Sequence, residues 1–169
     1  MNRETVRALC QLNTEFYERN AASFSQTRTA PWEGWRRCMA ACGFDDSDEA
    51  LGQSMDTQIA DSVLDIACGN LRFEAFLANT YPHVDWSFFA VDNCEPLVAS
   101  GQEDIAKKVH FTCEDIVSNL LDGLSAAEPA NTPAFAAATP FDLVVSFGFL
   151  HHIPSFDLRQ QFLLEALSQ

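Results

Sequence analysis

The sequence predicts an α/β fold in which a parallel sheet is covered by helices on both faces. Three observations support this prediction. From residue 62 onward, short apolar runs alternate with segments of helical periodicity. These runs are apolar almost throughout, as expected for strands buried on both faces. An acidic residue lies at or just after the end of three of them: Asp65, Asp92 and Asp115.

Residues 1–44 are expected to form a helical cap that precedes the sheet. Asn2 fits an N-cap, and apolar residues at helical spacing predict a helix to about residue 20. Pro31 fits the first turn of a second helix, which we expect to end at Gly43.

Residues 62–169 are expected to form the α/β domain. The predicted strands cover residues 63–67, 86–91, 109–113 and 143–147. The predicted helices cover residues 72–78, 95–106 with a break at Gly101, and 116–121. A last helix is capped by Ser155 and buries Leu158, Phe162 and Leu167.

Two segments lack a helical or strand period. Residues 45–61 are polar and acidic, and we interpret them as a linker between the cap and the sheet. Residues 122–140 are rich in Ala, Pro and Thr. We interpret them as a flexible loop, because loops of this length are usually mobile or functional.

Composition limits which partners the protein can bind and in which compartment it is expected. The formal net charge of -14 disfavours unaided nucleic-acid binding, because an acidic surface repels phosphate backbones. No apolar run reaches the roughly 18–20 residues of a membrane span, and the N-terminus lacks the pattern of a signal peptide. We therefore expect a cytoplasmic protein that does not enter a membrane.

The six cysteines are scattered, which favours reduced core thiols over a disulfide framework. Cys38 and Cys42 fit one helix face, but two ligands alone make a poor zinc site. We expect no metal.

The three acidic residues at the strand ends predict a binding site. Carboxylates gathered at one edge of a sheet are costly unless they bind something. Asp92 ends the second strand, where a carboxylate accepts ribose hydroxyls, and Asp115 is placed to accept from an adenine amino group. Asp65 would meet an ammonium group or orient the turn after the first strand. The alternative is that each is a cap or a surface turn residue; for all three in this order we favour binding.

Four segments resemble the motifs of class I S-adenosylmethionine-dependent methyltransferases. Residues 63–69 (VLDIACG) look like their first motif, and residues 89–92 (FAVD) like the ribose-binding strand end. Residues 113–116 (CEDI) resemble the adenine-side acidic motif. Residues 141–154 (FDLVVSFGFLHHIP) are similar to the segment that closes strand four.

The resemblance implies a Rossmann-like doubly wound parallel sheet, the class I methyltransferase fold, and S-adenosyl-L-methionine as cofactor. Methyl transfer by in-line displacement needs orientation more than covalent chemistry, so no catalytic residue is assigned. The resemblance places the cofactor contacts at Arg28, Asp65, Ala67, Cys68, Gly69, Asp92, Asn93, Asp115, Ile116 and Ser146.

The N-terminus is similar to the opening of the tRNA wobble-uridine carboxymethyl methyltransferases. The likeness rests on Phe16-Tyr17 with Ala21, on Phe24-Ser25-Gln26-Thr27-Arg28, and on Pro31-Trp32. In that branch the region caps the cofactor site and the substrate is an anticodon uridine. The acceptor stays open between a small molecule and tRNA.

Two features depart from the family pattern. The family turn carries three glycines, whereas Ala67 and Leu71 take the first and third positions here, and we expect Leu71 to place bulk beside the methionine portion of the cofactor. The chain supplies four of the seven family strands and the helix that follows. We therefore expect a fragment that binds cofactor weakly, shows no methyl transfer alone, and dimerises through the exposed edge of strand four.

Two pairs of residues have alternative interpretations. In the first interpretation, His151 or His152 lines the acceptor pocket as a base. In the second, one of them caps the last helix and the other packs. We favour the second, because methyl transfer needs positioning more than proton transfer. Trp32 and Trp35 form either a lid or part of the core, and the core is favoured for Trp35.

Two other functions compete with methyl transfer. The first is a catalytically inactive S-adenosylmethionine-binding or protein-interaction module. The second is a nucleotide-binding oxidoreductase, which the sparse glycines disfavour.

Overall fold

A computed structural model describes residues 1–44, 62–123 and 140–169. The linker expected over residues 45–61 lies outside the described residues. So does most of the loop expected over 122–140, although Asp122 and Gly123 belong to helix α6 (Ile116–Gly123).

The sheet is parallel throughout and has the strand order β3-β2-β1-β4. Its strands are β1 (Ser62–Ile66), β2 (Ser87–Asp92), β3 (Val109–Cys113) and β4 (Leu143–Val145). The register sets Asp65 opposite Ala90, and Asp92 opposite Cys113, so the strand carboxyl ends share one edge of the sheet. The parallel α/β sheet is confirmed, and β4 is two residues shorter than expected.

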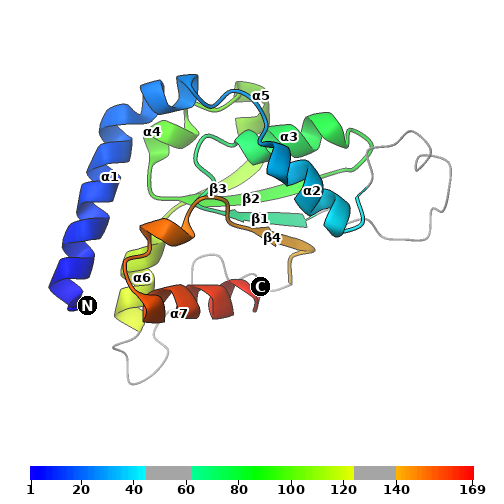
Figure 1. Ribbon diagram of the computed structural model, residues 1–169. Helices are drawn as coiled ribbons and strands as arrows, with labels where there is room; N and C mark the ends of the chain where they lie inside the picture. Colours follow the sequence, from blue (N-terminus) through cyan, green and yellow to red (C-terminus); the bar gives the residue numbers. More distant parts are fainter. Residues whose placement is uncertain (45–61, 124–139) are drawn as a thin grey trace.

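Helices cover both faces of this sheet (Figure 1). On one face lie α2 (Glu33–Ala41), α3 (Arg72–Thr80), α4 (Glu95–Val98) and α5 (Glu103–Ala106). On the other lie α6 and α7 (Phe156–Ala166), and the short 3-10 helix η2 (Leu150–His152) precedes α7.

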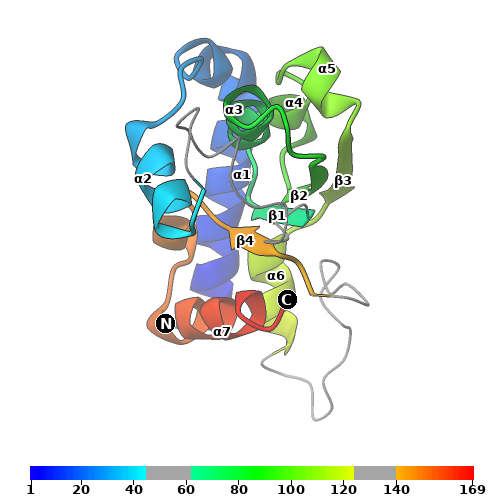
Figure 2. The same cartoon turned by 90° about the vertical axis from the view of Figure 1, so that its right-hand side faces the viewer.

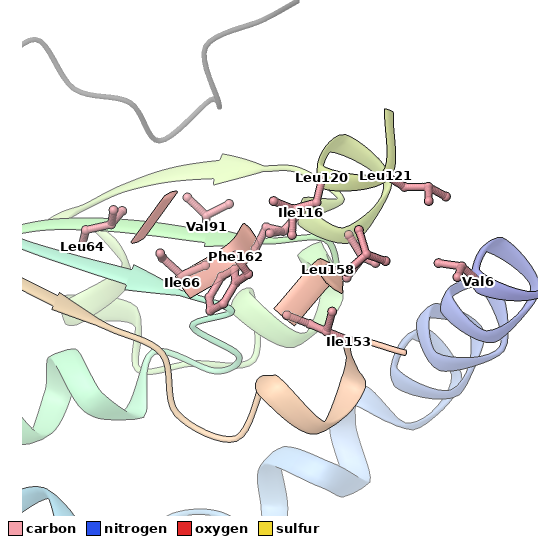
Figure 3. Packing of buried hydrophobic residues seen from close by; sticks show 11 residues of the cluster. Val6, Leu64, Ile66, Val91, Ile116, Leu120, Leu121, Ile153, Leu158 and Phe162 are labelled. Atoms are coloured by element: carbon pink, nitrogen blue, oxygen red, sulfur yellow. The ribbon is translucent and has the colours of Figure 1, made fainter. Parts of the chain in front are cut away.

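Each face of the sheet carries its own hydrophobic cluster, because successive side chains of a strand point to opposite faces. Val63 of β1 and Phe88 of β2 pack with α2 and α3. Leu64, Ile66 and Val91 point the other way and join a cluster with α6 and α7 (Figure 3). Phe162 of α7 is fully buried in that second cluster.

Helix α1 (Arg3–Gln26) runs along the carboxyl edge of the sheet, from α6 at one end to α4 at the other (Figures 1 and 2). Asn2 caps it as expected, accepting a hydrogen bond from the backbone N–H of Thr5 at 2.8 Å. The expected end near residue 20 is wrong. The helix continues because Ala21 packs against the residues that begin α4, and the Ser25 hydroxyl hydrogen-bonds to that of Ser100.

Two glycines end helices where the sequence predicts it. Gly43 has φ +89° after the last residues of α2. Gly101 separates α4 from α5, and a Cβ at this position would lie 2.7 Å from the carbonyl oxygen of Asn70. The expectation for Leu167 is wrong, because this C-cap residue of α7 is 84% exposed while Leu158 and Phe162 are buried.

All six cysteines are free thiols. Cys68 and Cys94 are buried, but Cys38, Cys42 and Cys113 are exposed, so core packing explains only part of the set. Among the described residues, His, Cys, Asp and Glu side chains do not gather in groups of three that fit a metal ion. In the same part of the chain, no helix combines the length and apolar character of a membrane span.

Candidate functional site

The turn between β1 and α3 has an unusual backbone. Alternate residues lie in the left-handed region: Ala67 at φ 65°, Gly69 at φ 61° and Leu71 at φ 58°. This conformation favours glycine, and an L-residue with a side chain adopts it at a cost of roughly 1–2 kcal/mol. The turn therefore keeps the dihedral pattern of a glycine-rich turn although it holds one glycine.

The end of β2 fixes this turn. The Val91 carbonyl accepts hydrogen bonds from the backbone N–H groups of Ala67 at 2.8 Å and Cys68 at 3.2 Å. Asp92 accepts from Gly69 N–H through Oδ2 and from Cys94 N–H through Oδ1, both at 2.9 Å. Burial raises the pKa of Asp92, and the bonds from backbone N–H groups oppose that rise.

Leu71 does not face the ligand side of the turn, so the expectation that it crowds the cofactor is wrong. Its side chain is 1% exposed and packs with Ala75, Val98 and Ile105 from α3, α4 and α5. Packing of this side chain in the core stabilises the left-handed backbone that Leu71 adopts.

A cavity of about 410 Å³ lies between the turn, the strand ends and α1. It brings together residues from segments far apart in the sequence. Nine of the ten residues proposed as cofactor contacts line it: Arg28, Asp65, Ala67, Cys68, Gly69, Asp92, Asn93, Asp115 and Ile116. The exception is Ser146, whose hydroxyl donates to the carbonyl oxygen of Ile66 at 2.9 Å and which is not among the lining residues.

The sequence predicts a cap over the site that contains Tyr17 and Phe24, but it does not point to Cys10, Asn13 or Thr14. One face of α1 holds all five and lines the cavity. Its residues recur at intervals of three, four and seven, a helical spacing that signals a shared face. They are Cys10, Asn13, Thr14, Tyr17 and Phe24. The cap is fastened to the cavity rim by hydrogen bonds from Asn93 to the Thr14 hydroxyl at 2.9 Å and from Asn70 to the Arg28 carbonyl at 3.4 Å.

Asp65, which lines the cavity, and Glu74, which does not, are two buried carboxyl groups whose charges interact. Asp65 is buried, and its Oδ1 has no hydrogen-bond partner among the described residues. Glu74, in the first turn of α3, is 0% exposed, and neither of its carboxyl oxygens has a partner there. Burial raises the pKa of Glu74 to about 8. Burial, then the charges of Glu74 and Asp92, raise the pKa of Asp65 well above its usual value, so the pair retains a proton at neutral pH.

Asp115 serves as a cap and also lines the cavity. Its Oδ1 accepts from the backbone N–H of Ser118 at 3.0 Å, and its Oδ2 from the Ser118 hydroxyl at 2.8 Å. Asp115 is therefore a helix-capping residue, as the alternative interpretation expected, and it also lines the cavity.

Arginine and aromatic side chains form one wall. The Arg28 guanidinium lies 4.0 Å from the Phe24 ring centroid, and that of Arg72 lies 4.9 Å from the Trp35 ring. Burial, followed by the charge of Arg28, lowers the pKa of Arg72.

The two tryptophans differ in role. Trp35 is 3% exposed and packs against Phe73 and Phe76, which confirms the core interpretation. Trp32 is exposed and lines the cavity, with its ring 6.1 Å from that of Phe147.

His151 and His152 belong to η2, and this short helix forms one end of the cavity. The expectation that one of them caps the last helix is wrong, because Ser155 caps α7 by accepting from the backbone N–H of Leu158. His152 lies with its Nε2 3.1 Å from the Tyr17 hydroxyl and its ring 3.9 Å from that of His151. All three side chains line the cavity.

Comparisons with known proteins bear on the fold. No family model matches this chain, and no curated protein sequence does. Among solved structures, the DhpI–SAM–HEP complex matches with a TM-score of 0.56 and 16% identity, over 99% of this chain and 62% of that chain. The plantazolicin methyltransferase BpumL, in complex with a pentazolic desmethylPZN analog and SAH, matches with a TM-score of 0.50 and 17% identity, over 99% and 57%.

At these identities the likeness concerns the fold alone. It confirms the predicted class I methyltransferase fold, a Rossmann-like parallel sheet preceded by a helical cap. The chain spans about three-fifths of the length of these structures.

Proposed function

We propose that this chain is the cofactor-binding part of an S-adenosylmethionine-dependent methyltransferase that acts on a small-molecule acceptor. One observation carries the proposal: the left-handed turn over Ala67, Gly69 and Leu71, fixed by Asp92 at the carboxyl edge of a parallel sheet. Ligands of open α/β sheets bind at this edge. The two solved structures that share the fold hold SAM and SAH, which supports the same cofactor here.

The residues present fit this cofactor. The carboxylate of Asp92 has lone pairs beyond those used by the turn, and these would accept the ribose hydroxyls. The orphaned Oδ1 of Asp65 would accept from the ammonium group. Arg28 would face the carboxylate, and Asp115 with Ile116 would border the adenine. The cavity volume lies within the range of roughly 300–1000 Å³ usual for small-ligand sites.

The cofactor, when bound, supplies an electrophilic methyl group. The chain would contribute orientation and exclusion of water. Helix α1 closes one side of the cavity through Tyr17 and Phe24, and Phe147 and Phe149 close another. Holding the acceptor in line with the methyl group contributes to rate by removing translational and rotational freedom before the reaction.

The cavity and the charge favour a small acceptor over tRNA. A net charge of -14 opposes an unaided polyanion, and the comparisons give no support to the tRNA wobble-uridine branch. BpumL is a plantazolicin methyltransferase, which supports a small or peptide-like acceptor in this fold. The alternative function is a binding or interaction module without catalysis.

Calorimetric titration of the purified chain with S-adenosylmethionine, S-adenosylhomocysteine and NADH tests the proposal. We expect the first two to bind and NADH not to bind. Binding of NADH in their place would overturn it. Absence of binding by both S-adenosyl ligands would also overturn it.

A further inference from the structure

Tyr17 and His152 form a polar contact inside the cavity. Tyr17 lies on α1 and His152 on η2, and the phenolic oxygen is 3.1 Å from Nε2 of the imidazole. The rings meet edge to face, with centroids 5.6 Å apart. Neither residue is among the predicted cofactor contacts, and both line the same cavity as those contacts.

The surroundings fix the protonation of this pair. Burial, and then the neighbouring His151, lower the pKa of His152, so its imidazole is neutral at pH 7. Burial raises the pKa of Tyr17; the charges of Asp92 and Cys94 add to this, and that of Arg28 opposes it. The phenol is therefore protonated. In the Nδ1–H tautomer of His152 it donates to Nε2, which leaves the oxygen lone pairs of Tyr17 available as acceptors.

We propose that Tyr17 and His152 act as a proton relay for a methyl acceptor that carries a hydroxyl group, an inference that rests on the proposed function. Tyr17 accepts the hydrogen bond of the acceptor hydroxyl, and His152 acts through Tyr17. A carboxylate or phosphonate acceptor is already ionised at neutral pH and needs no such relay. A hydroxyl keeps its proton at that pH and must lose it during transfer.

The step balances in atoms and charge. An oxygen lone pair of the acceptor forms the new C–O bond to the methyl carbon. The S–CH₃ bond breaks, and its electron pair stays on sulfur, which becomes a neutral thioether. The hydroxyl proton passes to the oxygen of Tyr17 as the phenolic proton passes to Nε2 of His152. The positive charge of the sulfonium is thereby replaced by that of the imidazolium.

The relay can be tested without methyl transfer, by use of a phenol whose ionisation changes its absorbance. The probe is 4-nitrophenol, titrated with pH in the presence of an excess of the purified chain saturated with S-adenosylhomocysteine. We expect the chain to raise the ionisation constant of the probe about tenfold, which means that the pKa of the bound phenol falls by about one unit. His152→Gln keeps a hydrogen-bond acceptor for Tyr17 but is not basic, and should abolish the increase. Tyr17→Phe keeps the ring and should abolish it too.

His83→Gln is the matched control, because His83 is exposed in the connection between α3 and β2, outside the cavity lining. It should behave as the unaltered chain does. An unaltered chain that leaves the ionisation constant unchanged would overturn the relay. A His152→Gln variant that raises the ionisation constant as strongly as the unaltered chain would also overturn the relay. Glutamine can replace histidine in a structural role but not as a base.

Calorimetry on the same samples separates this inference from the proposed function. We expect S-adenosylhomocysteine affinity to stay within about twofold in His152→Gln. If the unaltered chain binds S-adenosylhomocysteine but does not raise the ionisation constant of 4-nitrophenol, the relay alone is refuted. Absence of S-adenosylhomocysteine binding to the unaltered chain refutes the proposed function itself.

Discussion

The carboxylate of Asp92, the last residue of β2, accepts a hydrogen bond from the backbone N–H of Gly69 at 2.9 Å. This contact joins the end of the second strand to the turn that follows the first. Asp92 would thus have two tasks: it holds the turn, and it faces the cavity where a ribose would lie. Loss of this carboxylate should therefore affect both the turn and the cofactor.

Replacing Asp92 by alanine should weaken cofactor binding at least about tenfold. Hydrogen bonds to a charged group contribute about 1.5–3 kcal/mol, and 1.4 kcal/mol is a factor of ten in affinity. Isothermal calorimetry with S-adenosylmethionine measures the change, and Asp85→Ala, at an exposed position, is the control. An affinity within about twofold of the unaltered chain would show that the ribose assignment is wrong.

Replacing Glu74 by glutamine should reduce the loss of stability at high pH. The pKa of Glu74 is about 8 in the folded chain against an ordinary 4.5, so the folded state holds a proton that the unfolded state releases. Stability therefore falls as pH rises between these values, by up to about 1.4 kcal/mol per pH unit. Glutamine resembles the protonated acid and cannot ionise.

Urea denaturation at pH 5 and pH 8 measures this effect. At pH 5 the variant and the unaltered chain should be similar in stability, and at pH 8 the variant should be the more stable. Asp65 still titrates, so part of the pH dependence remains. The exposed Asp104→Asn variant is the control. Parallel curves for Glu74→Gln and the unaltered chain would contradict the assignment of the proton to this pair.

Two substitutions at Leu71 separate packing from backbone strain. Deleting a buried leucine side chain costs about 2–5 kcal/mol, and glycine relieves about 1 kcal/mol of left-handed strain that alanine keeps. We therefore expect the order of stability to be leucine, then glycine, then alanine, measured by thermal unfolding. Cofactor affinity should change little in Leu71→Gly, because the side chain lies in the core. Tighter binding in that variant would mean that the leucine obstructs the ligand.

The free side of β4 should mediate pairing between two copies of the chain. Among the described residues, β4 hydrogen-bonds to β1 and forms one edge of the sheet. Exposed edges are templates for pairing. We expect sedimentation to show a concentration-dependent dimer, and hydrogen exchange to show that Leu143–Val145 become protected as concentration rises. The opposite edge, β3, is the internal control; equal protection there, or a monomer at all concentrations, would contradict this prediction.

The sequence predicts the order of strands and helices well, because most strands are short apolar runs and because α1, α6 and α7 begin at residues whose side chains cap them. Most of the predicted contact residues do line the cavity, because parallel strands bring their carboxyl ends to one edge. Residues at the strand ends therefore meet whatever the connections between them. Ser146 is the exception, since its hydroxyl is satisfied by the neighbouring strand β1.

The features that sequence reasoning misses depend on contacts between distant segments. The length of α1 is set by its contacts with α4, and local periodicity does not contain them. The direction of the Leu71 side chain follows from a positive φ that no propensity of leucine predicts. The Tyr17–His152 contact joins residues 135 positions apart. Glu74 was missed because a carboxyl on a buried helix face has no local signature.

The turn over Ala67, Gly69 and Leu71 has a consequence for the recognition of distant relatives. A search pattern written in glycines would pass over this segment, because two of its three glycine positions hold other residues. A search written in dihedral angles would find it. In chains this divergent, the path of the main chain and the groups that anchor it are a more durable signature than the residues that usually make such a path easy.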